Sequence, residues 1–168
     1  DVGARATSLV TGNVDNAGPS DFVLLSRPNT TGNSDLVVVT TSDTGAPREP
    51  IVNEIICPFS GGGGSSCPAS AVALADFNAD GKLDCATVNG KSVTVLVGDC
   101  AGNLSPIPAQ SLEGEGVSIV AGDFNGDGKR DLATANPKQG TLNILYNDCK
   151  GSFQKAVAVP AEITTRWV

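Results

Sequence analysis

The chain has 168 residues, carries a formal net charge of −7 and contains neither histidine nor methionine. This length suits a single domain with a sizeable core. The acidic balance argues against nucleic acid or an anionic membrane as a partner, and no apolar run is long enough to span a bilayer. Histidine, the commonest general base, is absent, and Glu113 and Glu115, the closest acidic pair outside the loops described below, lie among glycines. We therefore expect a protein that is not an enzyme.

A nine-residue motif, D-F-N-x-D-G-x-x-D, occurs at 76–84 and again 47 residues later at 123–131. The segments that follow also match, Asp84-Cys-Ala-Thr-Val-Asn89 with Asp131-Leu-Ala-Thr-Ala-Asn136. A period of this size with several short strands per repeat is typical of a propeller or a solenoid. The second and third strands are apolar on consecutive residues, which suits sheets covered on both faces. We predict an all-β chain of about three four-stranded, propeller-type blades followed by one C-terminal extra strand.

The first repeat, about 6–68, is degenerate. Residues 13–21 fit the frame of the motif, but Ala17 at position five has no ligand oxygen. Leu36-Val-Val-Val-Thr-Thr41 matches the third strand of the later repeats. Asn29 opens a glycosylation acceptor triplet.

Five cysteines are many for a cytosolic protein of this size and indicate an oxidising compartment. Cys57 and Cys67 flank a loop rich in glycine and serine, and a disulfide between them would close it. Cys85 and Cys100 lie near the two ends of a predicted hairpin, so they form a second candidate pair, and Cys149 is left over. The alternative is that some of these are buried free thiols.

The second repeat spans about 69–116 and the third about 117–159. Asn89-Gly90 predicts a hairpin turn in the second repeat, and Asn103 opens another glycosylation acceptor triplet. Residues 160–168 are expected to add the extra strand. The strands predicted for the third repeat are about Val117–Phe124, Asp131–Ala135, Thr141–Asn147 and Phe153–Val159.

The motif places oxygen-bearing side chains at positions one, three, five and nine of a tight loop. A hard cation such as Ca²⁺ takes 6–8 oxygen ligands, the glycine at position six allows backbone angles that a Cβ would forbid, and the backbone carbonyl at position seven is a further expected ligand. A plain surface turn is the alternative, but the second copy argues against it. An EF-hand needs a glutamate at position twelve and a following helix, whereas Thr87 and Thr134 stand there and strands follow. The predicted ligands are Asp76, Asn78, Asp80, Lys82 (backbone) and Asp84 in one loop, and Asp123, Asn125, Asp127, Lys129 (backbone) and Asp131 in the other; the weak third site offers Asn13, Asp15 and Asp21.

The stretches Leu-Ala-Asp-Phe-Asn-Ala-Asp-Gly-Lys-Leu-Asp (74–84) and Val-Ala-Gly-Asp-Phe-Asn-Gly-Asp-Gly-Lys-Arg-Asp-Leu-Ala (120–133) resemble FG-GAP, or VCBS-type, repeats. The resemblance covers about 6–159, well in the last two repeats and poorly in the first. It implies blades of an integrin-α-like β-propeller in which the loop joins the first two strands and binds Ca²⁺ through the positions named above. The resemblance also leads us to expect Phe77 and Phe124 to pack between blades.

Relatives of this kind are mostly extracellular recognition modules, so we expect a secreted or cell-surface, calcium-binding module that recognises or adheres to a protein or carbohydrate ligand. A self-assembling extracellular fibre or coat protein and a non-catalytic accessory domain of a secreted enzyme are the alternatives. Because three blades are fewer than the 4–8 of a closed propeller, we expect other copies of the chain, or missing blades of a longer one, as partners.

Overall fold

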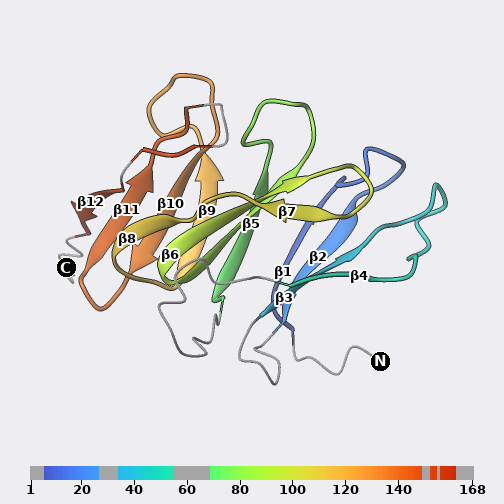
Figure 1. Ribbon diagram of the computed structural model, residues 1–168, viewed down its shortest axis with the longest axis horizontal. Coiled ribbons are helices and arrows are strands. Elements are labelled where there is room, and N and C mark those ends of the chain that lie inside the picture. Colours follow the sequence, from blue (N-terminus) through green and yellow to red (C-terminus); the bar gives the residue numbers. More distant parts are fainter. Residues whose placement is uncertain (1–5, 27–33, 55–68, 149–151, 155, 162–168) are drawn as a thin grey trace, which may run out of the picture.

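The computed structural model describes residues 6–26, 34–54, 69–148, 152–154 and 156–161. This part of the chain consists of twelve strands in three antiparallel sheets, with no helix among the described residues. Figure 1 shows the sheets side by side in chain order, without closing into a ring. The predicted all-β fold with propeller-like blades is therefore confirmed. None of the described residues belongs to a helix long and apolar enough to cross a membrane.

The first sheet holds β1 (Ala6–Gly12), β2 (Asp21–Ser26), β3 (Asp35–Val39) and β4 (Ile51–Glu54) in that spatial order. Its inner strands are almost wholly apolar, as expected for a sheet with neighbours on its faces. In β2, Val23 and Leu25 are fully buried.

The second sheet holds β5 (Ala71–Ala75), β6 (Asp84–Gly98), β7 (Leu104–Pro106) and β8 (Gln110–Gly116). The long strand β6 folds back on itself at Gly90, which has a φ of 57°. Thr87 Oγ1 donates to the carbonyl of Thr94 across the fold, so the hairpin turn predicted at Asn89-Gly90 is confirmed. Both β7 and β8 pair with β6 and together form the outer strand.

The third sheet holds β9 (Ser118–Gly122), β10 (Asp131–Asn136), β11 (Thr141–Leu145) and β12 (Val157–Pro160). The last strand begins later than the predicted Phe153, which makes only an isolated bridge to Asn147. The ring of Phe153 is buried against Phe77, edge to face, with 5.8 Å between the ring centroids. Of the predicted C-terminal strand, Pro160 ends β12 and residues 162–168 lie outside the described part.

The first strands of neighbouring sheets pack together, β1 against β5 and β5 against β9. The described residues form two apolar cores between the sheets. The core between the first and second sheets contains Val23, Leu25, Leu36, Val72, Cys85 and Leu96; the core between the second and third contains Ala73, Phe77, Val93, Val95, Ile119, Leu132 and Leu145.

The two phenylalanines of the motif differ. Phe77 is buried between the second and third sheets, as predicted, whereas Phe124 is 44% exposed. The expectation for Phe124 is wrong, because no further sheet of the described chain covers the outer face of the third sheet.

The cysteines also differ from expectation. Cys85 and Cys100 are free thiols, so the predicted bond between them is not formed. Cys85 is buried in the core at the start of β6, where burial raises the pKa of its thiol. Cys100 lies beyond the end of β6 and accepts a hydrogen bond from Asn16 Nδ2 at 3.3 Å. The predicted pair Cys57–Cys67, the leftover Cys149 and the acceptor Asn29 lie outside the described residues.

Candidate metal-binding loops

Three loops join the first two strands of the three sheets: 13–20 after β1, 76–83 after β5 and 123–130 after β9. Figure 1 shows them on the same side of the molecule. This is the connection that the resemblance implied, and it sets the candidate ligands of all three repeats along one edge.

The three loops share one backbone conformation. Each has a positive φ at positions four and six, the region that favours glycine. The first loop therefore keeps the fold of the motif although its sequence has diverged. The angles are 56°, 61° and 80° at Asn16, Ala79 and Gly126, and 66°, 84° and 82° at Gly18, Gly81 and Gly128.

In the second loop, the side chains at positions one, three and five converge. Asp76 Oδ1 and Asn78 Oδ1 both accept a hydrogen bond from the backbone N–H of Asp80, at 3.1 and 3.0 Å. Asp80 Oδ2 accepts one from Asn78 Nδ2 at 3.1 Å. Two oxygens that share one N–H must lie close together, so this loop brings carboxylate and amide oxygens to one exposed point.

The third loop repeats this geometry. Asp123 Oδ1 and Asn125 Oδ1 share the backbone N–H of Asp127, at 3.2 and 3.0 Å, and Asp127 Oδ2 accepts from Asn125 Nδ2 at 3.1 Å. The hydrogen bond from the backbone N–H of Gly128 lowers the pKa of Asp123, so this carboxylate stays charged. A negative point of this kind attracts cations.

In all three loops, the environment of the aspartate at position nine differs from that of the side chains at positions one, three and five. Asp21, Asp84 and Asp131 are 0% exposed. In each, one carboxylate oxygen accepts from the backbone N–H at position two and the other from a backbone N–H at or just beyond the end of the third strand. The distances are 2.8 and 2.8 Å from Val14 and Thr41, 2.9 and 3.0 Å from Phe77 and Gly98, and 3.0 and 2.9 Å from Phe124 and Asn147.

This aspartate therefore anchors the loop to the sheet. Burial raises the pKa of Asp84, and the bonds from Gly98 and Phe77 act in the opposite direction. The described residues contain no group of three or more Asp, Glu, His and Cys side chains placed to hold a metal ion, which agrees with the turn of the third carboxylate toward the backbone. A carboxylate oxygen has further lone-pair capacity, so position nine stays a predicted ligand.

The residues of the second and third loops fit a hard cation. The side-chain donors at positions one, three and five are oxygens that already converge, and two of these three side chains in each loop are carboxylates. Lys82 and Lys129 stay predicted backbone ligands at position seven. Calcium prefers such oxygen donors over nitrogen or sulfur.

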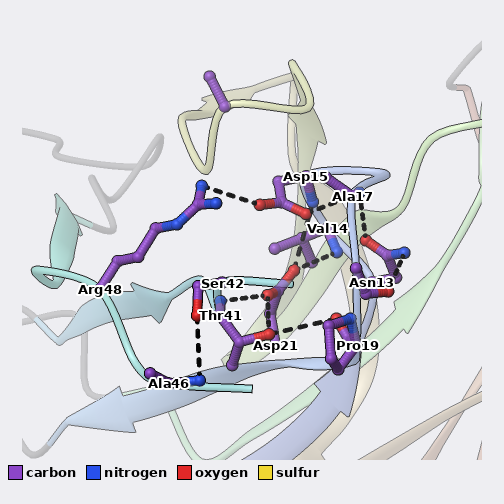
Figure 2. A network of polar contacts seen from close by, with 12 residues as sticks. Asn13, Val14, Asp15, Ala17, Pro19, Asp21, Thr41, Ser42, Ala46 and Arg48 are labelled. Atoms are coloured by element: carbon purple, nitrogen blue, oxygen red, sulfur yellow. Dashed lines mark hydrogen bonds and ion pairs between the residues drawn. The ribbon is translucent and has the colours of Figure 1, made fainter. Parts of the chain in front are cut away.

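The first loop has the same hydrogen bonds to the backbone N–H at position five, but it has fewer carboxylates. Asn13 Oδ1 and Asp15 Oδ1 share the backbone N–H of Ala17, at 3.0 and 2.9 Å. Position five adds no oxygen, but Arg48, which follows β3 in the connection to β4, places Nη1 3.7 Å from Asp15 Oδ2 (Figure 2). Nothing in the spacing of the motif marks Arg48, because it lies far along the chain from the loop that it contacts.

Asn103, the second glycosylation acceptor, lies exposed between β6 and β7. Its Nδ2 donates to Asp99 Oδ2 at 2.7 Å, and this bond lowers the pKa of Asp99. The side chain is at the surface but is held by its neighbour.

Comparisons with known proteins bear on the fold and the repeat. No curated protein matches the chain. Among solved structures, the Tc holotoxin pore of Photorhabdus luminescens is similar at 18% identity and a TM-score of 0.49, over 95% of this chain and 7% of that one. BBS1N in complex with ARL6DN is similar at 9% identity and a TM-score of 0.51, over 96% of this chain and 56% of that one.

At such identities the similarity to BBS1N concerns the fold alone. The chain spans only part of both structures, 7% of one and 56% of the other. Residues 76–134, which include both complete loops, match the family described as the FG-GAP-like repeat. Residues 76–134 are therefore identified as FG-GAP-type repeat sequence, and the described part of the chain has a β-propeller-like fold.

Proposed function

We propose that the chain is a calcium-binding module for extracellular recognition, and that its second and third loops each hold one Ca²⁺. The observation that carries this proposal is the repeated convergence of oxygens on the N–H of Asp80 and of Asp127. Each loop presents two carboxylates at positions one and five, which repel one another without a cation and match the charge of one divalent ion.

Recognition is supported by the architecture. Three packed sheets form a rigid base, and the loops lie along one of its edges (Figure 1). Binding residues are commonly found in loops that a rigid scaffold positions. Bound calcium would fix the shape of two of these loops, and the ligand at this edge would be a protein or a carbohydrate. The proposal assigns no catalytic activity, and it places the chain in the secreted or cell-surface compartment, where millimolar calcium is available.

The test is thermal unfolding of the chain in calcium and in excess chelator. A ligand that binds only the folded state adds about 2.7 kcal/mol per site at 100 times its dissociation constant. We expect chelator to lower the melting temperature by several degrees. Asp127→Ala should remove one of two bound ions in a calorimetric titration, whereas Asp43→Ala, at an exposed position outside the loops, should leave both. An unchanged melt in chelator would contradict the proposal.

A second candidate function, self-assembly, is favoured by the outer face of the third sheet. The second sheet buries three apolar side chains against the third sheet. The equivalent positions of the third sheet also carry apolar side chains, but there these side chains are exposed. This face therefore has the composition of an interface between sheets. The buried residues are Ala73, Phe77 and Val93 at 7%, 1% and 1% exposure, and their equivalents are Val120, Phe124 and Leu142 at 54%, 44% and 40%.

A further inference from the structure

The three loops differ in the charge that they present. A position-nine aspartate with two backbone hydrogen bonds is common to all three loops. The difference in charge between the loops therefore comes from the other carboxylates. The second loop presents Asp76 and Asp80 and the third Asp123 and Asp127, whereas the first presents Asp15 alone. The charge of two carboxylates is balanced by one divalent ion, whereas the charge of one carboxylate is balanced by one cationic side chain.

Arg48 supplies such a side chain. Its Nη1 lies 3.7 Å from Asp15 Oδ2, and Figure 2 shows the guanidinium reaching across to this carboxylate. The side chain of Asp15 is only 7% exposed, whereas that of Arg48 is 52% exposed, so the pair joins a buried carboxylate to a guanidinium at the surface. A carboxylate so far removed from water needs a partner, because an unpaired buried charge is costly.

The backbone brings Arg48 to this place. The N–H of Arg48 donates to the carbonyl of Thr40 at 2.8 Å, and the N–H of Thr41 donates to Asp21 Oδ1 at 2.8 Å. Asp21 is the position-nine anchor of the same loop. The segment that carries Arg48 is therefore fastened to the loop that Arg48 neutralises.

Among the described residues, the other two loops have no equivalent of this arrangement. Within the described part of the chain, no ion pair reaches the second loop. In the third, Lys129 Nζ lies 3.6 Å from Asp127 Oδ2, but both side chains are about a third exposed and the lysine belongs to the loop itself. Such an exposed pair contributes little, and the charge of Asp123 remains.

We propose that Arg48 is the built-in cation of the first loop, in the place that a metal ion takes in the other two. The first loop then keeps its shape without calcium, and calcium binding is confined to the second and third loops. This inference rests on the proposed function for those two loops.

The first experiment is thermal unfolding in excess chelator, where no loop holds metal. Arg48→Gln should lower the melting temperature by a measurable shift, and the same shift should appear in calcium. Arg48→Lys, which restores the positive charge, should recover part of it. The control is Lys138→Gln, which breaks a pair with Glu115 in which both partners are exposed; we expect no shift there.

The second experiment counts bound calcium ions by calorimetric titration. Ala17→Asp restores the missing position-five oxygen. With Arg48→Gln it should create a third site, whereas with Arg48 kept the third ion should bind about tenfold more weakly or not at all, because the guanidinium repels it. Arg48→Gln alone should leave two sites.

Two results would overturn the inference: a melting temperature of Arg48→Gln equal to wild type in chelator, or a third ion bound equally well by Ala17→Asp with and without Arg48. If the double variant, Ala17→Asp with Arg48→Gln, bound no third ion, the inference that Arg48 stands in the place of a metal ion would also be overturned. A wild-type chain that binds no calcium would instead refute the proposed function, and the melts in chelator would still report on the ion pair.

Discussion

At the scale of single residues, the aspartate at position nine holds each loop to its sheet through two backbone hydrogen bonds. Asp21, Asp84 and Asp131 are fully buried, and each bonds the same two backbone N–H groups of its repeat. The anchor survives in the first repeat, where position five has lost its oxygen. A structural role therefore accounts for the aspartate at position nine even where no metal is expected.

This role predicts the effect of Asp84→Asn. The substitution replaces one acceptor oxygen by an N–H donor that faces a backbone N–H. A hydrogen bond to a charged group contributes about 1.5–3 kcal/mol, and the cost of burying the charge, seen in the raised pKa of Asp84, offsets part of this. We expect a loss of about 1–3 kcal/mol of unfolding free energy, measured by denaturant titration, with and without chelator.

The comparison between the two conditions separates anchor from ligand. If Asp84 acted only as a metal ligand, its substitution would have no effect in chelator. Asp21→Asn in the first loop is the matched control, since we expect no calcium there. This variant should lose a similar amount of unfolding free energy with and without chelator.

At the scale of elements, the loops are held in strained backbone positions. Ala79 has a φ of 61° where the third loop has Gly126 at 80°. An alanine in this region costs about 1–2 kcal/mol, less the entropy that glycine loses on folding. We expect Ala79→Gly to stabilise the chain by about 0.5–1 kcal/mol and Gly126→Ala to destabilise it by a similar amount.

Denaturant titration of the two variants checks this prediction. A Cβ added at Gly126 would meet no heavy atom within 4 Å, so a clash cannot account for the effect. Equal stabilities of Ala79→Gly and wild type would show that the loop tolerates the alanine without strain.

Strands and loops were predictable because their signals are local. The repeated motif, the consecutive apolar residues and Asn89-Gly90 each report on a few neighbouring residues. Side-chain partners from distant segments were not predictable in the same way: Cys85 faces a core and Cys100 lies past the strand end, although both flank one hairpin. Arg48 reaches Asp15 only through the fold of the segment after β3.

The same limit applies to Phe124. Its sequence context is nearly identical to that of Phe77, so burial was predicted for both. Whether a side chain is covered depends on the next sheet, and the motif carries no information about how many sheets follow.

At the scale of the whole molecule, both outer faces carry exposed apolar side chains at positions that are buried between sheets inside the chain. The outer face of the third sheet carries apolar side chains at the positions that the second sheet buries against the third. The outer face of the first sheet carries Leu9 and Phe22, 56% and 41% exposed, at the positions where the second sheet buries Val72 and Cys85 against the first. The outer face of the third sheet therefore resembles the side of the second sheet that meets the third. The outer face of the first sheet resembles the side of the second sheet that meets the first.

Two copies can meet through these faces in the way that neighbouring sheets already meet within one chain. The contact is head to tail, because different surfaces are used on the two partners, and such contacts give rings where the rotation closes and filaments where it does not. Exposed apolar faces of this kind favour association.

The prediction is that the chain associates in solution. Light scattering in the presence of calcium should give a mass above the 16.9 kDa of one chain, falling on dilution. Leu142→Lys should shift the mass toward one chain, because association would bury an unpaired ammonium group, while Ala101→Lys, in an exposed loop, should leave it unchanged. Both variants should melt like wild type under dilute conditions, since neither site is in a core. A wild-type chain that stays monodisperse at the mass of one chain across the concentration range would refute self-assembly through these faces.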